Sequence, residues 1–439
     1  MSSATITTSA RLMNSTPQTE EQAMVRKVAV SSFLGNFIEW FDYASYSYFA
    51  TTIALVFFPT DNHTVAMLQT FGVFALSFIL RPIGALFWGS YGDKKGRKAA
   101  LAHSIMFMSG ASFLIGCLPS YSVIGVGAPI LLLLLRMVQG FSASGEYAGA
   151  ATFLGEYAPT SKRGIYCSLI PASTAIGLLA GSTLATLMTA NLNSSAMVGW
   201  GWRVPFLLAG PLGLIVLYIR AKLADSPVYQ SMNDALESKG AASADGQIAA
   251  KSGMFAPLAE LFHNHLKALI ISFGACVLNA VGFYTVLTYL PTYLSDTVGM
   301  DAPQSGTICL VAYVFMVFGM GHISDKFGRK KVLIGACVAF IVLTVPAFLI
   351  LNTSQFWPVL LVELAMCPSL TANDGTLSSY LTETFPTSVR FTGFAFSFNL
   401  ANAIFGGTAS FIATVLIALT GSSIAPAWYM VGVAAIALV

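Results

Sequence analysis

A ten-residue motif occurs twice in this chain, and its two copies lie half a chain apart. The first copy, Gly89–Lys98, reads GSYGDKKGRK, and the second, Gly321–Lys330, reads GHISDKFGRK and begins 232 residues later. Each copy is a short basic loop between two long apolar runs. A charged loop repeated at half-length predicts two copies of one membrane-embedded unit, an organisation that favours transport over catalysis or scaffolding.

The charge content supports a membrane protein. Only 9% of the 439 residues are charged and 56% are hydrophobic, whereas soluble domains carry about 25% charged residues. Long apolar stretches must therefore face lipid. Most Lys and Arg residues lie in the N-terminal tail and in alternate loops, which the positive-inside rule predicts to be cytoplasmic. These basic patches are short and adjoin spans, so they require no nucleic-acid partner.

Twelve apolar runs are long enough, or nearly long enough, to cross a bilayer, which takes about 17–25 residues. We expect an all-α membrane protein with twelve transmembrane helices in two six-helix bundles, whose last helix, from about 425 to Val439, is cut short. The expected parts are a cytoplasmic tail (1–27), an N-terminal bundle (28–221), a cytoplasmic linker (222–265) and a C-terminal bundle (266–439). Ser238, Gly240 and Gly246 give the middle of the linker the composition of a loop. The six cysteines lie in apolar segments without a C-x-x-C pair, which argues against a metal site or a disulfide framework.

A second motif is also duplicated, with an offset of 227 residues. Glu156–Arg163 reads EYAPTSKR and Glu383–Arg390 reads ETFPTSVR. An arginine can hold a carboxylate through two hydrogen bonds, so we expect Arg97 to pair with Glu156 and Arg329 with Glu383. We hypothesise that these pairs, together with Asp93 and Asp325, latch one conformation at the cytoplasmic side. The simpler alternative is that the basic loops only fix topology.

The first span carries two carboxylates, Glu39 and Asp42, on one helical face with Asn36 and Tyr46. Carboxylates in a span are costly and usually face a polar cavity. Either acid is a candidate proton site, and the alternative is a structural pair with a buried arginine.

The fourth span holds Arg136, Gln139 and Glu146, and the spacing of seven residues places Gln139 and Glu146 on one face. Arg136 could bind a substrate carboxylate or tune an acid, and an Arg–Glu pair that joins helices is an equal alternative. We expect Arg81, near the inner end of the second span, to reach the membrane surface.

In the second half, Asn373 and Asp374 lie in the middle of a span, where they could line a binding site. Hydrogen bonding between helices is the common alternative for such asparagines.

The paired G-x-x-x-D-K-x-G-R-K motifs resemble the signature loops of the major facilitator superfamily, and Leu132–Gly140 resembles its fourth-helix motif, which the family links to proton coupling. Several segments are similar to the bacterial metabolite:proton symporters, which carry proline and betaine, 2-oxoglutarate, citrate or shikimate. They include Gly35–Asp42, Gln139–Tyr147, Trp200–Phe206 and Asn402–Gly407.

The resemblance implies a proton-coupled symporter of the bacterial inner membrane that imports a small polar metabolite, either a proline/betaine-type zwitterion or a di- or tricarboxylate, by alternating access. The expected partners are the substrate, a proton and the lipid bilayer, with no cofactor, metal or enzymatic activity. The rival hypothesis is a transporter-like nutrient sensor that binds without transport. The substrate- and proton-binding candidates are Glu39, Asp42, Arg136, Gln139, Glu146, Asn373 and Asp374, and the gating candidates are Asp93, Arg97, Glu156, Asp325, Arg329 and Glu383.

Overall fold

The computed structural model describes residues 17–60, 62–242, 253–290, 293–300 and 303–438. This part of the chain is built from helices and contains no strand. Ten of its helical stretches are long and apolar enough to cross a membrane, and α23 (Ala425–Leu438) is a shorter apolar helix. The all-helical expectation is confirmed. The stretch that contains α2 (Pro17–Tyr48) is not among the ten, since Glu39, Asp42 and its charged start make it more polar.

The first half of the chain begins with α2 and ends with α13. The elements after α2 are α3 (Ala50–Phe57), α4 (His63–Ile79), α5 (Arg81–Lys95), α6 (Arg97–Cys117), α7 (Tyr121–Ile124), α8 (Gly127–Ala143), α9 (Glu146–Tyr157), η1 (Thr160–Lys162), α10 (Arg163–Cys167), α11 (Leu169–Asn191), α12 (Ser194–Ala196), η2 (Met197–Gly201) and α13 (Arg203–Ala221). Several spans are thus broken into two consecutive helices. The break between α4 and α5 falls at Leu80, with Pro82 in the first turn of α5, where proline is tolerated.

The second half repeats this organisation. Its elements are α16 (Leu266–Phe283), η3 (Tyr284–Tyr289), η4 (Tyr293–Val298), α18 (Pro303–Phe327), α19 (Arg329–Leu351), α20 (Phe356–Thr384), α21 (Arg390–Ala401), η5 (Asn402–Gly406), α22 (Ala409–Thr420) and α23. The segments η3 and η5 are π-helical turns, which are rare and occur frequently at functional sites.

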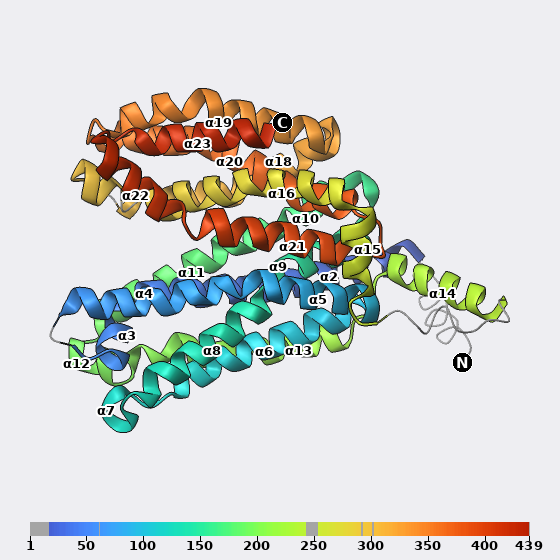
Figure 1. Cartoon of the computed structure of the whole chain (residues 1–439), viewed down its shortest axis with the longest axis horizontal. Helices are drawn as coiled ribbons and strands as arrows, with labels where there is room; N and C mark the ends of the chain where they lie inside the picture. Colours follow the sequence, from blue (N-terminus) through green and yellow to red (C-terminus); the bar gives the residue numbers. More distant parts are fainter. Residues whose placement is uncertain (1–16, 61, 243–252, 291–292, 301–302, 439) are drawn as a thin grey trace, which may run out of the picture.

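The two halves lie against each other as two layers of helices (Figure 1). Helix α5 of the first half packs on α21 of the second half, and α10 and α11 of the first half pack on α18. Small residues allow close approach within a half as well: a side chain at Gly181 on α11 would collide with Ala44 on α2. The interface between the halves is the frame for the candidate sites.

The segment between the halves contains two helices, α14 (Pro227–Ala242) and α15 (Ala256–Asn264). Ser238 and Gly240 lie in α14, so the predicted loop does not begin where composition suggested, and Gly246 lies outside the described residues. Proline in the first turn and the run of helix formers around Leu236 explain why a helix forms here.

Candidate functional site

Three carboxylates in the first half are each bonded to a buried arginine. The pairs are Glu39 with Arg81 at 2.8 Å, Asp42 with Arg136 at 2.8 Å, and Glu146 with Arg220. All six side chains are at most 5% exposed. A buried charge requires a partner of opposite sign, and removal of either partner leaves an uncompensated charge in the membrane interior.

Asp42, Arg136 and Gln139 form one cluster. The Gln139 amide donates to Asp42 at 3.1 Å and also to the Ser112 hydroxyl. The Arg136 guanidinium lies 3.7 Å from the centre of the Tyr46 ring, which adds a cation–π contact. The structure therefore brings together three of the residues selected from the sequence.

Glu146 lies elsewhere in the first half. It bonds Arg220 and accepts a hydrogen bond from Ser104 at 3.3 Å. Arg220 is fully buried in the last turn of α13. Gly35 makes room for this pair, because a side chain there would lie 2.1 Å from the Glu146 carboxylate.

Arg81 does not reach the membrane surface, so that expectation was wrong. Its side chain is 3% exposed, and its Nη2 donates to Glu39 at 2.8 Å and to the Tyr43 hydroxyl at 2.5 Å. The guanidinium also lies 4.6 Å from the centre of the Phe78 ring. A carboxylate partner and two aromatic rings hold the charge inside the protein. Phe78 precedes Arg81 by three residues, whereas Glu39 and Tyr43 come from α2, which the sequence could not place next to α5.

A small cavity lies between the two halves. Its volume is about 20 Å³, which is room for roughly one water molecule. The residues that line it are Trp40, Tyr147, Pro171, Thr174, Asn279, Phe283, Tyr313, Asp374, Phe398 and Asn402. The first four belong to the first half and the others to the second, so any ligand held here would contact both halves.

The cavity combines one carboxylate with aromatic rings. Asp374 accepts hydrogen bonds from the Asn279 amide and the Tyr313 hydroxyl, both of which are neutral donors. Tyr147 stacks on Phe398 across the interface, with ring centres 4.3 Å apart, and the ring centres of Trp40 and Phe283 are 5.3 Å apart. Asn373 is buried next to Asp374 but is not one of the cavity residues.

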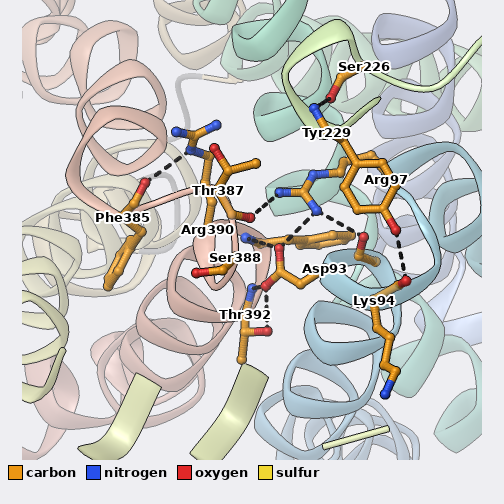
Figure 2. A network of polar contacts seen from close by, with 12 residues as sticks. Asp93, Lys94, Arg97, Ser226, Tyr229, Phe385, Thr387, Ser388, Arg390 and Thr392 are labelled. Atoms are coloured by element: carbon orange, nitrogen blue, oxygen red, sulfur yellow. Dashed lines mark hydrogen bonds and ion pairs between the residues drawn. The ribbon is translucent and has the colours of Figure 1, made fainter. Parts of the chain in front are cut away.

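A second polar cluster lies at one end of the helices, where the repeated motifs are. We call this end of the protein the basic end (residues 93–98, 156–163, 325–331 and 383–392). Arg97 bonds Asp93 at 3.1 Å and Glu156 at 3.2 Å. It also donates to the carbonyl oxygen of Thr387 in the second half, at 2.7 Å. The pairing of Arg97 with Glu156 expected from the sequence is present, and Figure 2 shows that the cluster spans both halves.

Asp93 binds the start of a helix that belongs to the other half. Its carboxylate accepts the backbone N–H groups of Phe391 at 3.1 Å and Thr392 at 2.8 Å, and the Thr392 hydroxyl at 2.7 Å. These residues form the first turn of α21, whose N–H groups and dipole favour an anion. Asp93 therefore joins α5 to α21, as Figure 2 shows.

The second copy of the motif makes the reciprocal contacts. Asp325 accepts the backbone N–H groups of Gly164 at 2.7 Å and Ile165 at 3.0 Å, at the start of α10 in the first half. Arg329 bonds Asp325 at 2.8 Å and Glu383 at 3.1 Å. Each half thus supplies a carboxylate to a helix start in the other.

Two further ion pairs cross between the halves at the basic end. Arg390 bonds Glu156 at 2.8 Å, and Arg163 bonds Glu383 at 3.2 Å. Glu383 is 32% exposed whereas Glu156 is 1% exposed, so water and salt screen the second pair more strongly. Arg163 and Arg390 are the last residues of the two copies of the second duplicated motif, Glu156–Arg163 and Glu383–Arg390. Their equivalent positions were the sequence signal that could have identified them.

The linker contributes to the first cluster. Asp225 accepts the backbone N–H of Arg97 at 3.0 Å, and the Ser226 hydroxyl donates to Glu156. The Tyr229 ring lies 5.0 Å from the Arg97 guanidinium. No sequence motif pointed to these residues, because they have no counterpart in the second half.

Comparison with known proteins identifies the family. The sequence profile of the family described as sugar (and other) transporter matches residues 27–439. The chain belongs to this family of the major facilitator superfamily. A transporter of glycine betaine, proline, ectoine and pipecolic acid from Dickeya dadantii is 36% identical over 95% of this chain and 83% of its own length. The proline/betaine transporter of Escherichia coli K12 is 34% identical over the same shares of the two chains.

Solved structures agree with the family's fold. The proton:xylose symporter XylE bound to 6-bromo-6-deoxy-D-glucose superposes with a TM-score of 0.77, at 15% identity and 95% coverage of both chains. The transporter FucP in an outward conformation gives 0.63 at 13% identity. The protein is therefore a multi-pass membrane transporter of the major facilitator type and not an enzyme.

Proposed function

We propose that this transporter imports a small zwitterion of the proline/betaine type together with a proton, by alternating access. The relatives named as proline/betaine transporters cover 95% of the chain, which supports this substrate class. We place the basic end in the cytoplasm of a bacterial cell, since the positive-inside rule favours that orientation.

The chemistry of the cavity between the halves carries the choice of substrate. Aromatic rings attract a quaternary or secondary ammonium group through cation–π contacts, and Asp374 supplies a carboxylate beside them. Among the described residues that line the cavity there is no Lys or Arg. A di- or tricarboxylate would need such cations, so the lining favours a positively charged group.

The conformation of the basic end supports alternating access. The bonds from Asp93 and Asp325 to helix starts in the opposite half hold this end together. The cavity of about 20 Å³ is too small for a solute such as proline. Import would require the halves to separate first at the other end and then at the basic end, with the repeated motifs as the gate.

Proton coupling needs a carboxylate that changes charge during the cycle. Of the candidates, Asp42 is joined to Arg136 and Gln139, and Glu146 to Arg220, and neither acid lines the cavity. Asp374 lies in the cavity and is bonded by neutral donors, and Glu39 directly precedes the cavity residue Trp40 on α2. We assign the coupling to Glu39 and Asp374 and a supporting role to the other two acids.

Uptake into proteoliposomes tests the function. Purified protein should accumulate radiolabelled glycine betaine or proline under an inward proton gradient, and a protonophore should abolish the accumulation. Trp40→Leu should reduce uptake, whereas Trp428→Leu, at an exposed position on α23, should not. Saturable binding without accumulation would support the nutrient sensor, and accumulation of citrate but not of betaine would refute the proposed substrate class.

A further inference from the structure

The surroundings of Arg81 contain two buried donors without acceptors. The Arg81 Nε atom and the Tyr284 hydroxyl each have no hydrogen-bond partner among the residues that the structure describes, although neither atom is exposed. Tyr284 comes from the second half of the chain, and its ring centre lies 6.5 Å from that of Phe78, the ring that the Arg81 guanidinium contacts. Buried polar groups are rarely left unpaired in folded proteins, so two such donors near one guanidinium require an explanation.

A carboxylate is the group that fits these donors. The Arg81 guanidinium already binds one carboxylate oxygen of Glu39, through Nη2. Guanidinium groups bind carboxylates through two parallel N–H bonds, and the unpaired Nε–H next to the occupied Nη2 provides such a fork. The other Glu39 oxygen, Oε2, is also buried and accepts no hydrogen bond from any described residue, so Glu39 itself does not satisfy the fork.

The Arg81 site lies next to the cavity that contains Asp374. Trp40 contacts Tyr43, the tyrosine that bonds Arg81, with ring centres 5.8 Å apart. On the other half, Phe283 lines the cavity and contacts Tyr284 at 5.6 Å. Trp40 and Phe283 thus both line the cavity of Asp374, and each also contacts a tyrosine near Arg81. A zwitterion requires both a carboxylate and a cation in its binding site.

We infer that Arg81 and Tyr284 form the carboxylate-binding end of the zwitterion site, and that the substrate carboxylate takes the place of Glu39 on Arg81. This inference rests on the proposed function and adds to it the residues that distinguish a zwitterion from a simple cation. The ammonium group then lies among the rings near Asp374, once Trp40 and Phe283 have moved apart. Tyr284 donates its hydroxyl to the same carboxylate, which links substrate binding to the second half.

The exchange also accounts for one proton per substrate. When the substrate carboxylate replaces it, the Glu39 carboxylate loses its cation while still buried. Glu39 then takes one proton from the aqueous side and becomes a neutral acid, because an unpaired charge inside the membrane is costly. The remaining ionisable groups that act on Glu39 are Asp42 and Glu146, each paired with its own arginine, and Tyr43 and Tyr284.

Binding measurements with glycine betaine and choline test the inference, because choline has a hydroxymethyl group in place of the carboxylate. Dissociation constants would be measured by the quenching of tryptophan fluorescence in detergent. Arg81→Gln should weaken glycine betaine binding by about 10- to 150-fold, the loss of a hydrogen bond to a charged group. It should change choline binding less than threefold, so that the preference for betaine disappears. Arg203→Gln removes a guanidinium that bonds the carbonyl oxygens of Gly116 and Leu118, and it should change neither constant.

Glu39→Gln provides a second test in a variant that retains Arg81. Removal of the competing carboxylate should tighten glycine betaine binding and abolish its dependence on pH between 5 and 8. Weaker or unchanged binding in Glu39→Gln, or an equal loss of betaine and choline binding in Arg81→Gln, would overturn the inference while leaving the proposed function intact. If the wild-type protein binds neither betaine nor proline, the proposed function fails, and the inference fails with it.

Discussion

Replacement of Asp93 by Asn should open the basic end of the transporter. The carboxylate accepts three hydrogen bonds from the first turn of α21, two of them from Thr392. An amide retains one acceptor oxygen and presents an N–H group in place of the other. The Arg97 guanidinium contacts the Oδ1 position, so the amide keeps its oxygen there and turns its NH₂ group toward Thr392. The variant therefore loses the two bonds from Thr392 to Oδ2, together with the favourable interaction between an anion and the start of a helix.

The size of the effect follows from these contacts. A hydrogen bond to a charged group contributes about 1.5–3 kcal/mol, so two lost bonds at the lower value cost about 3 kcal/mol. This cost applies only to the conformation in which α5 meets α21. The ratio of closed to open molecules at the basic end should therefore fall by roughly a hundredfold.

Double electron–electron resonance measures distances between two spin labels and can detect this shift. Labels would be attached through Lys162→Cys and Lys331→Cys, which are exposed positions in opposite halves, after Cys117→Ser removes the exposed native thiol. Asp93→Asn should move the distance distribution to longer values. Asp234→Asn makes the same chemical change at an exposed position on α14 and serves as the control. An unchanged distribution in a folded Asp93→Asn protein would refute the argument.

Three other results are expected. Gly35→Ala should lower the thermal unfolding midpoint in detergent, because its side chain would press the Glu146–Arg220 pair apart, whereas Gly110→Ala, with open space around it, should not. Gly89→Ala should open the basic end in the spin-label assay, since its side chain would lie 2.5 Å from the Thr392 Cα, and Gly335→Ala should leave the distances unchanged. Burial raises the pKa of Asp225, so the charged form of this carboxylate is disfavoured when the linker is docked. Docking of the linker should therefore weaken as the pH rises above the ordinary carboxylate pKa of about 4. Hydrogen exchange of α14 should show this dependence, and Asp225→Asn, which keeps the accepting Oδ1, should remove it.

The duplicated motifs allowed some of the contacts at the basic end to be predicted. Arg97 and Glu156, and likewise Arg329 and Glu383, could be paired because the two motifs recur in the same order in both halves, with the paired residues 59 positions apart in the first half and 54 in the second. The bonds from Asp93 to Thr392 could not be predicted, since no sequence pattern says which helix starts of the other half lie nearby. The roles of all these residues in gating stay a prediction.

The positions of the buried arginines could not be predicted from the sequence. Arg81 and Arg220 lie near the ends of apolar runs, where a long side chain can usually reach water. What keeps them inside is a carboxylate on another helix, Glu39 for one and Glu146 for the other. The hydropathy of a sequence indicates how deep a residue lies along its own helix, but not which side chains of other helices surround it. The sequence signal for two buried arginines was that Glu39 and Glu146 in the first half each needed a partner of opposite charge.

The reciprocal contacts at the basic end have the symmetry of an isologous dimer, in which a residue i of one subunit meets j of the other and j meets i. Asp93 of the first half reaches α21, and Asp325 of the second half reaches α10, the equivalent helix start. In an ancestral pair of identical six-helix chains, one such contact would have arisen twice through a single substitution. Two copies within one chain can change independently, and here the first copy is buried beneath the linker while Glu383 of the second is open to water.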